Sequence, residues 1–329
     1  MGSREFRCVA FPPGFGEFLA RVEGPLSELT GPLKQLWCQG SLAAAVTSPQ
    51  AETWASQKAW TEALDSVTSG WLDNEVSCRL SSLKRLQSGA HSGAWLVSLP
   101  LERHAISAFS PSEWRVLLRF RCGVPLLPRA RCGGCDAVMD TFGDHALSCA
   151  SCGRYARHNR LRQAVAFEYE QAGQPFRLEV ELPGQLSRPA DILAVEPEEA
   201  SPAAVDVSVV HPLRPSAAPA ASAEVVPGAS AEAREAEKLA AAGGACAAAG
   251  WRFVPLCADT TGAWGPRAKG ALRRLIRLQS MKLGQPVKAV AAIVWRMLAV
   301  AVAKGAAQCL LRAFPGFEAH CSPGEAESR

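Results

Sequence analysis

Residues 131–159 read RCGGCDAVMDTFGDHALSCASCGRYARHN, and four cysteine and histidine side chains in this stretch have the spacing of metal ligands. Cys132 and Cys135 enclose two glycines, His145 follows after nine residues, and Cys149 follows after three more. Thiolate and imidazole are the ligands that zinc prefers, and a CxxC turn can present two thiolates to one ion. His145 and Cys149 are four residues apart and therefore share one face of a helical turn. The spacing predicts a structural zinc site.

The fourth ligand of this site has two candidates, because Cys152 is a spare thiol that can replace Cys149. The alternative to a zinc site is a set of reduced cysteines and a histidine in a loop-rich region. Four ligands at these spacings favour zinc over this alternative. No glutamate follows His145 at the spacing of a deaminase, so a catalytic zinc of that type is not expected.

The length and charge of the chain set broad limits. At 329 residues it has room for two or three small domains. A formal net charge of +4 is mild, so nucleic-acid binding must be judged from local clusters of basic residues. Twelve cysteines are too sparse for a disulfide scaffold. The N-terminus lacks the apolar segment of a signal peptide, and we expect a reducing compartment, nuclear or cytoplasmic.

The order CxxC, GDHALSC and RHN in residues 131–159 resembles the CCHC zinc knuckle and Arg-His element of site-specific non-LTR retrotransposons. In that family the knuckle precedes a restriction-like endonuclease, and both follow a reverse transcriptase. The resemblance runs from about residue 85 to about residue 270. No Asp-Asp pair occurs in the chain, so a polymerase active site is not expected. The chain is then a C-terminal fragment or a free-standing relative.

Three acidic positions on short strands are candidates for metal chemistry. The strands are predicted at residues 176–182, 190–195 and 203–210. They carry Glu179 or Glu181, then Asp191, then Asp206, and the choice between the two glutamates stays open. Two carboxylates on adjacent strands can hold one Mg²⁺, which neutralises developing charge and activates a water in phosphodiester hydrolysis. Asp206 is the strongest candidate, since its strand is otherwise apolar and an unpaired charge there is costly.

The spacing of these acids also resembles the PD-(D/E)xK nuclease pattern, with fourteen residues between Asp191 and Asp206. In the endonucleases of these retroelements the lysine comes from the following helix, and the resemblance implies Lys238 for that role. A lysine there helps to orient the water and to stabilise transition-state charge. Three positions depart from the pattern, namely Ala190 within the Pro-Asp pair, Ser208 in place of the usual strand lysine, and Ala242 in place of a tyrosine.

Basic residues gather on two predicted helices, at residues 154–172 and 270–282. The candidates for phosphate contacts are Arg154, Arg157, His158, Arg273, Arg274 and Arg277. Cations at a helix N-terminus oppose the macrodipole, so a nearby anion would relieve the repulsion. The alternative is a solvated basic face or pairing with acids. We expect DNA as the partner, with RNA as the alternative, and leave the oligomeric state open.

The rest of the chain divides by composition into regions of different character. We predict a helical N-terminal region (1–88), a helical lead-in (89–130), the CCHC zinc knuckle and Arg-His element (131–159), a restriction-endonuclease-like core (160–265), basic and apolar C-terminal helices (266–321) and a disordered tail (322–329). Within the lead-in, Ser110 should cap a helix that starts at Pro111. Residues 289–303 are apolar but too short to span a bilayer, so we expect a buried helix and no membrane association.

Together these patterns predict an α+β protein with a small mixed β-sheet flanked by helices. Two functional hypotheses follow. In the first, the chain is a retrotransposon-derived, Mg²⁺-dependent DNA endonuclease that nicks a strand by means of Asp191, Asp206 and Lys238, with a structural zinc beside it. In the second, it is a catalytically inactive, zinc-containing nucleic-acid-binding protein that retains these carboxylates as structure.

Overall fold

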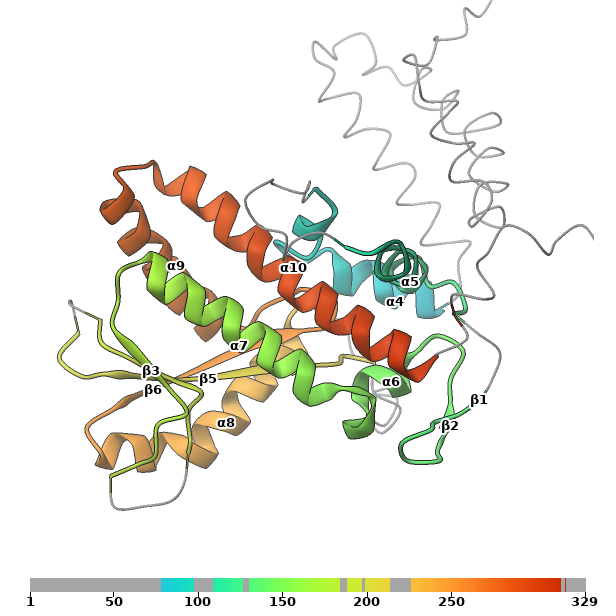
Figure 1. Cartoon of the computed structure of the whole chain (residues 1–329), viewed down its shortest axis with the longest axis horizontal. Coiled ribbons are helices and arrows are strands. Elements are labelled where there is room, and N and C mark those ends of the chain that lie inside the picture. The colour runs from blue at the N-terminus through green and yellow to red at the C-terminus, as the bar shows by residue number, and fades with distance from the viewer. Residues whose placement is uncertain are drawn as a thin grey trace, which may run out of the picture. The chain divides into compact units, whose positions relative to one another are not determined.

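A four-stranded mixed sheet is built from β3 (Phe176–Leu178), β4 (Ile192–Ala194), β5 (Ala203–Val210) and β6 (Arg252–Asp259), in that spatial order (Figure 1). β3 and β5 both pair antiparallel with β4, whereas β5 and β6 run parallel. Parallel neighbours need a crossover connection, which here contains α8 (Ala229–Ala248). The chain thus meanders through three strands and returns through a helix to the fourth.

The computed structural model describes residues 78–97, 109–126, 130–183, 188–196, 199–213, 226–314 and 317. Every structural statement below concerns these residues. Most of the predicted N-terminal helical region and the whole of the predicted disordered tail lie outside them.

Strand β5 has the bounds that its sequence predicts. Both of its alanines and most of its valines are buried; Val205 is 0% and Val207 is 1% exposed. Parallel strands covered on both faces are rich in such residues, because no side of them meets water. Asp206 therefore lies between two buried valines, in the middle of the sheet.

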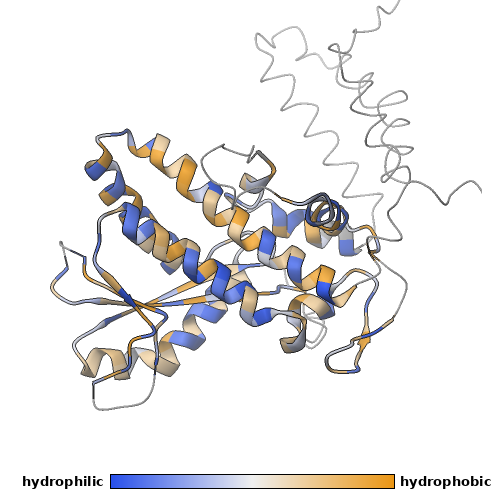
Figure 2. Ribbon diagram, viewed as in Figure 1, coloured by the Kyte–Doolittle hydropathy of each residue, from blue (hydrophilic) through white to orange (hydrophobic). Residues whose placement is uncertain are grey.

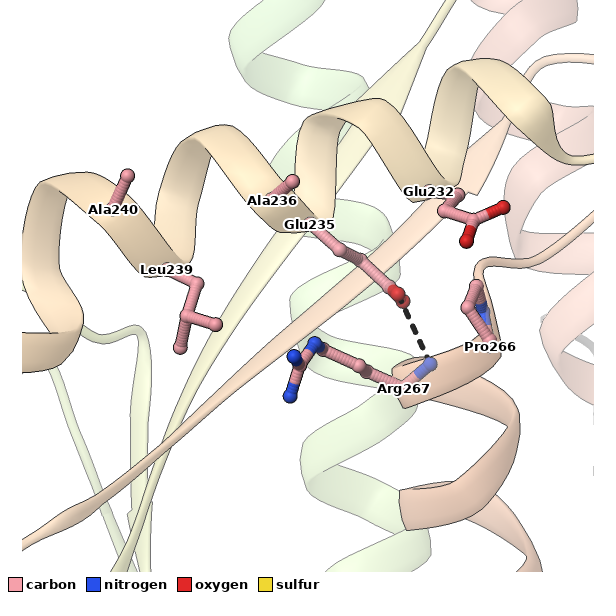
Figure 3. Close-up of a pocket in the computed structure, with 7 residues that line it drawn as sticks. All are labelled: Glu232, Glu235, Ala236, Leu239, Ala240, Pro266 and Arg267. Atoms are coloured by element: carbon pink, nitrogen blue, oxygen red, sulfur yellow. Dashed lines mark hydrogen bonds between the residues drawn. The ribbon is translucent and has the colours of Figure 1, made fainter.

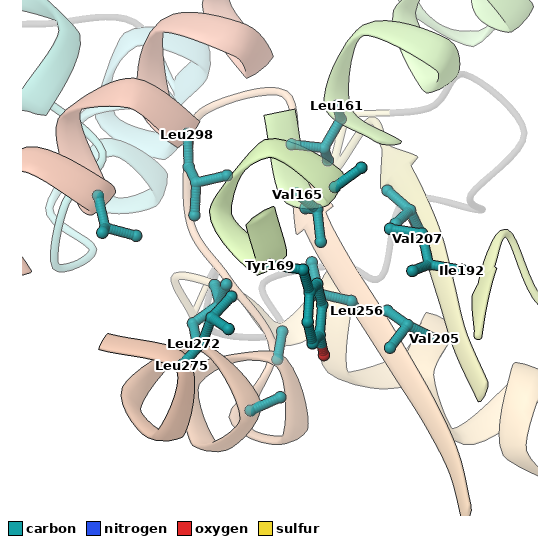
Figure 4. Packing of buried hydrophobic residues seen from close by; sticks show 14 of the residues in the cluster. Leu161, Val165, Tyr169, Ile192, Val205, Val207, Leu256, Leu272, Leu275 and Leu298 are labelled. Atoms are coloured by element: carbon teal, nitrogen blue, oxygen red, sulfur yellow. The ribbon is translucent and has the colours of Figure 1, made fainter. Parts of the chain in front are cut away.

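One face of the sheet is covered by three helices, α7 (Arg154–Gln171), α9 (Pro266–Leu283) and α10 (Val287–Ala313). Their apolar side chains form the main core with β4, β5 and β6, and Figure 4 shows members from every one of these elements. The labelled residues are Leu161, Val165, Tyr169, Ile192, Val205, Val207, Leu256, Leu272, Leu275 and Leu298.

The other face is covered by α8, which packs through small side chains (Figure 1). Ala204 of β5 and Cys246 of α8 are both 0% exposed and belong to one small cluster. Small residues let a helix approach a sheet closely, and this brings the α8 side chains within reach of β5. The prediction of an α+β protein with a small mixed sheet flanked by helices is confirmed.

Short elements precede the sheet. They are α4 (Cys78–Gln87), η2 (Ala94–Val97), α5 (Pro111–Arg121), β1 (Ala130–Arg131), β2 (Val138–Met139), α6 (Asp144–Ser148) and η4 (Ala150–Cys152). The start of α5 is as predicted. The Ser110 hydroxyl accepts from the Glu113 N–H at 3.1 Å, and the Glu113 carboxylate accepts from the Ser110 N–H at 2.9 Å. This reciprocal capping box satisfies two backbone donors that lack helical partners.

Helix α10 is longer than the 15-residue apolar segment that predicted it, and spans 27 residues. Among the described helices it alone is long and apolar enough to cross a membrane, but 67% of its most apolar window is buried inside the protein. Figure 2 shows orange residues along α10 and many blue ones along its neighbour α7. The central residues Val294 and Leu298 are 0% exposed, so the prediction of a buried helix is confirmed.

Several predicted boundaries are corrected. The strand predicted at 176–182 ends at Leu178, because Glu179 adopts a positive φ of 51° that breaks the extended ladder. The strand predicted at 190–195 is confined to Ile192–Ala194. The basic helix α9 begins at Pro266, four residues earlier than predicted.

Glu235 of α8 holds the start of α9. Its carboxylate is 1% exposed and accepts backbone N–H groups of Arg267 at 3.0 Å and Ala268 at 2.8 Å, which caps a helix end that lacks a side-chain cap of its own. A Cβ at Gly265 would lie 2.2 Å from a Glu235 carboxylate oxygen, so a larger residue there would have to displace this carboxylate from its cap. Figure 3 shows the hydrogen bond between Glu235 and Arg267, in a groove between the two helices.

Asp259, at the end of β6, is a buried acid whose ionisation opposes folding. Its carboxylate is 0% exposed and accepts the N–H groups of Thr261 and Ala263 and the Thr261 hydroxyl. Burial nevertheless raises the pKa of Asp259 from 3.8 to about 6. Between these two values the folded chain holds a proton that the unfolded chain has released, so the contribution of Asp259 to stability falls as the pH rises.

We expect this decline to amount to roughly 1.4 kcal/mol per pH unit between about pH 4 and pH 6 and to level off above pH 6. Asp259→Asn keeps the carbonyl acceptor and cannot ionise, so its stability should lack this component. Urea unfolding of both proteins at pH 5.0, 6.0 and 7.0 measures the difference. Parallel pH profiles for the two proteins would contradict the assignment.

Candidate metal centre and catalytic site

The four predicted zinc ligands lie together. The ligand atoms of Cys132, Cys135, His145 and Cys149 are all within 4.8 Å of one another. The Sγ atoms of Cys135 and Cys149 are 3.6 Å apart, and His145 Nε2 lies 3.3 Å from Cys135 Sγ. Tetrahedral zinc with Zn–S bonds of about 2.3 Å separates its sulfurs by about 3.8 Å. The cluster can bind a metal ion, and its donor set and spacing are consistent with zinc.

The first two ligands are placed by the β1–β2 hairpin. The Cys132 N–H donates to Ala137 O at 2.9 Å, and the Asp136 N–H returns to Cys132 O at 2.9 Å, which closes the CxxC turn. A Cβ at Gly134 would lie 2.2 Å from Ser151 Cβ, so the turn requires glycine. Burial raises the pKa of the Cys132 thiol, but backbone hydrogen bonds from Gly134 and Cys135 outweigh it and lower the pKa to about 6.

The other two ligands are placed by α6. The Asp140 carboxylate accepts the N–H groups of Phe142, Asp144 and His145 at 2.9, 3.1 and 2.7 Å, and so fixes the first turn of this short helix. Cys149 follows the helix directly. Cys152 lies beneath the cluster, buried, with its Sγ 3.6 Å from Cys132 Sγ. The compact set of four contains Cys149, which favours Cys149 as the fourth ligand.

A second group of chemically active side chains lies around Asp206 of β5. Lys238 Nζ of α8 donates to Asp206 Oδ2 of β5 at 2.5 Å. The two side chains are only 16% and 15% exposed, so water screens the pair little. Lys238 of the crossover helix α8 therefore contacts Asp206 of β5, the acid with which the nuclease pattern groups it.

Asp191, just before β4, completes this group. Its Oδ2 accepts the Val207 N–H at 2.7 Å, and its Oδ1 lies 3.0 Å from His158 Nε2 of α7. Burial raises the pKa of Asp191, but His158 and the Val207 N–H outweigh it and lower the pKa. Burial also raises the pKa of Asp206; Lys238 opposes this, the adjacent Asp191 carboxylate adds to it, and the pKa stays raised. Asp191 thus bonds to the residue that follows Asp206, and side chains from α7, α8 and β5 lie around these two acids.

The two candidate glutamates are held by arginines. Glu179 pairs with Arg162 of α7 and lies 3.7 Å from Arg188, while Glu181 accepts from Arg188 at 2.8 Å. The Glu179 N–H donates to Asp191 O at 2.9 Å, so its backbone adjoins the carboxylate group although its side chain turns to arginine. Of the two, Glu179 is the nearer to the catalytic candidates along the sheet.

The predicted nucleic-acid residues separate into buried and exposed. Arg157 is 2% exposed and donates to the carbonyls of Leu147 at 2.8 Å and Val209 at 3.2 Å, so it joins α6 to β5 and does not face a phosphate. Arg274 pairs with Glu199 at 2.8 Å. The exposed members of the set are Arg154, Arg273 and Arg277.

Sequence reasoning missed a buried network that links the knuckle to the sheet. His211, just after β5, lies 2.6 Å from the Thr260 hydroxyl through Nδ1 and 3.0 Å from Asp144 through Nε2. Arg79 of α4 pairs with the same Asp144, which directly precedes the ligand His145. No sequence signal joins residues separated by 49 and 67 positions. The Cys₃His cluster is thus fastened to the strand that carries Asp206.

Comparison with known proteins yields no relative: no protein-family model matches the chain, and no curated protein matches it. Function must therefore be inferred from the chain's own residues. Those residues define two sites, a Cys₃His cluster with zinc-type spacing and a buried carboxylate pair with a lysine and a histidine.

Proposed function

We propose that the chain is a metal-dependent DNA endonuclease with a restriction-endonuclease-like core, in which Asp191 and Asp206 hold a Mg²⁺ ion. The observation that carries the proposal is the 2.5 Å contact of Lys238 with Asp206, beside Asp191, which accepts the N–H of the next residue, Val207. Their spacing in the sequence predicted this grouping from the nuclease pattern. The order of elements, a helix, three meandering strands, a crossover helix and a parallel fourth strand, also supports that core.

The donor set fits a hard divalent ion. Magnesium takes oxygen ligands, usually one or two carboxylates with waters and substrate oxygens in the remaining positions. Asp191 is held by the Val207 N–H and Asp206 by Lys238, so both carboxylates are oriented before any ion arrives. A bound ion would neutralise charge at the phosphate and would lower the pKa of a bound water.

Each protein group then has a defined task. Asp191 and Asp206 would hold the ion, and Lys238, which donates to Asp206, would stabilise the negative charge that develops on a scissile phosphate bound beside them. Arg154, exposed and one turn before His158 on α7, can hold a neighbouring phosphate of the strand. We further propose that the Cys₃His cluster is a structural CCHC zinc knuckle that anchors α6 and α7 beside this centre.

The proposal is tested by nicking of supercoiled plasmid with the full chain carrying one equivalent of zinc. We expect open-circular product when Mg²⁺ or Mn²⁺ is added and none when zinc is the sole metal, with the zinc content unchanged throughout. If the chain binds plasmid but does not convert it with any of the added ions, the endonuclease proposal is wrong. The chain would then be the catalytically inactive nucleic-acid-binding protein.

A further inference from the structure

Cys152 is a further thiol at the Cys₃His cluster, and the proposed zinc site does not use it. Its side chain is 4% exposed, and its Sγ lies 3.6 Å from Cys132 Sγ. The Sγ atoms of Cys135 and Cys149 are separated by the same 3.6 Å. The four thiols therefore form two close pairs, and each pair connects the β1–β2 hairpin with the segment that follows α6.

The backbones that carry these two pairs are also in contact. The Ser151 hydroxyl donates to Gly134 O at 3.2 Å, and a Cβ at Gly134 would lie 2.2 Å from Ser151 Cβ. Gly134 lies between the two cysteines of the hairpin, and Ser151 lies between the two cysteines that follow α6. A disulfide has an S–S bond of about 2.05 Å, so each pair has to close by only about 1.5 Å, which is within the reach of side-chain rotation.

We propose that these four cysteines are a site of reversible oxidation, at which hydrogen peroxide converts the cluster into two disulfides, Cys135–Cys149 and Cys132–Cys152. The inference rests on the proposed zinc knuckle for the occupant of the reduced cluster. The two disulfides join the same two segments that the ion joins, so the hairpin stays attached to α6 when the metal leaves. Cys152 supplies the sulfur that makes the second disulfide possible.

The oxidation begins at Cys135, which is the exposed cysteine of the cluster. Its thiolate attacks peroxide, the O–O bond breaks, and a sulfenic acid and one water form. Cys149 Sγ then attacks this sulfur, the S–O bond breaks, and the oxygen leaves as a second water. Solvent supplies one proton for each water. The ion loses two ligands in this step and departs as Zn²⁺, with its charge unchanged.

A second peroxide oxidises the buried pair in the same way. Departure of the ion exposes the Cys132 thiolate, which attacks peroxide and becomes a sulfenic acid with release of water. Cys152 Sγ attacks the Cys132 sulfur, and the thiol proton of Cys152 leaves with the oxygen as water. Each disulfide therefore consumes one peroxide, and the two electrons that its sulfurs lose reduce that peroxide to two waters.

Four cysteines can pair in three ways, and the distances favour one of them. The crossed pairing would use the contact of Cys132 with Cys149, whose sulfurs are 4.0 Å apart. Pairing within each CxxC motif would leave the hairpin and α6 unconnected. The proposal uses the two 3.6 Å contacts, and the pairing is therefore the property that tests it.

The test exposes the zinc-loaded full chain to hydrogen peroxide, blocks the remaining thiols with iodoacetamide and maps the disulfides by mass spectrometry without reduction. Cleavage after arginine and before aspartate places Cys132 and Cys135 in peptide 132–135 and the other two cysteines in peptide 144–154. We expect release of one equivalent of zinc, and the two peptides joined by two disulfides without any alkyl group. Two separate peptides with one internal disulfide each would overturn the proposal.

Cys152→Ser identifies the partners, because it removes one sulfur and leaves the four zinc ligands in place. The reduced variant should bind one equivalent of zinc, which also shows that it is folded. After oxidation we expect the disulfide Cys135–Cys149 and an unpaired Cys132, alkylated or oxidised to a sulfinic acid. An unpaired Cys135 would indicate the crossed pairing and overturn the proposal. Cys122→Ser, outside the cluster, is the matched control and should give the wild-type map.

Thermal unfolding measures whether the disulfides replace the ion. The oxidised, metal-free wild type should unfold at a midpoint about 5 °C or more above that of the reduced, metal-free protein, because two cross-links constrain the unfolded chain. Dithiothreitol with zinc should restore one equivalent of bound metal. An oxidised midpoint no higher than the reduced one, or no recovery of zinc, would contradict a reversible oxidation that keeps the hairpin attached.

The same measurements separate this inference from the proposed knuckle. A chain that binds no zinc but forms the two predicted disulfides would support the oxidation site and overturn the zinc knuckle. A zinc-loaded chain whose four cysteines form no disulfide with peroxide would support the knuckle and overturn the oxidation site.

Discussion

Loss of metal from the Cys₃His cluster is expected to unfold the knuckle and lower the thermal midpoint of the protein by about 10 °C or more. Zinc binding at such sites contributes on the order of 10 kcal/mol to folding, and a loss of only about 4 kcal/mol shifts the midpoint of a domain of this size by about that amount. Cys135→Ser removes one ligand at an exposed position, so little else in the packing changes.

The effect should extend beyond the knuckle because its helix is bonded to the sheet. Asp144 contacts His211 at 3.0 Å, and the carbonyl of Leu147 accepts from Arg157. Metal analysis and thermal unfolding by circular dichroism measure the outcome, with Cys122→Ser, a half-buried cysteine outside the cluster, as the matched control. Full metal content and an unchanged midpoint in Cys135→Ser would contradict the assignment of these ligands.

Features encoded within a short stretch were predictable from the sequence. The four side chains of the Cys₃His cluster lie within eighteen residues, and the capping box of α5 lies within four. Strand β5 matched its predicted bounds because a short run of alanines and valines is typical of a buried strand. The grouping of Asp206 with Lys238 was also predicted, although it needed the resemblance to a nuclease pattern as well as the residues.

Features set by distant partners were not predictable. Arg157 looked like part of a basic surface, but its two acceptors lie 10 and 52 positions away, and they draw it into the interior. Strand β3 ended early because Glu179 turns toward Arg162, which α7 supplies. Local alternation of polar and apolar residues carries no information about either contact.

The length of α10 also depends on a contact with a residue that is distant in the sequence. The predicted apolar segment stopped before Lys304, since a lysine usually marks the edge of a buried helix. In the fold Lys304 is 8% exposed, and its ammonium lies 5.6 Å from the centre of the Phe109 ring. This cation–π contact helps the helix to continue past the charge. Phe109 lies far from α10 in the sequence, so nothing in the segment itself indicated the continuation.

Asp206→Asn is expected to reduce the rate of plasmid nicking by about a thousandfold, which corresponds to roughly 4 kcal/mol of transition-state stabilisation. Asparagine keeps the shape of the side chain and an oxygen for Lys238 but removes the charge that holds the ion. Asp259→Asn is the matched control and should retain the wild-type rate. Asp259 is also buried and lies on the adjacent strand β6, four residues beyond Pro255, which is the partner of Asp206 in the sheet. Urea unfolding and zinc content establish that both variants are folded.

The most direct test of the carboxylate centre is therefore the initial rate of Mg²⁺- or Mn²⁺-dependent conversion of supercoiled to open-circular plasmid by these three proteins. The proposed function predicts equal rates for the wild type and Asp259→Asn and a rate near background for Asp206→Asn. Nicking by Asp206→Asn at the wild-type rate, or no nicking by any of the three, would contradict it.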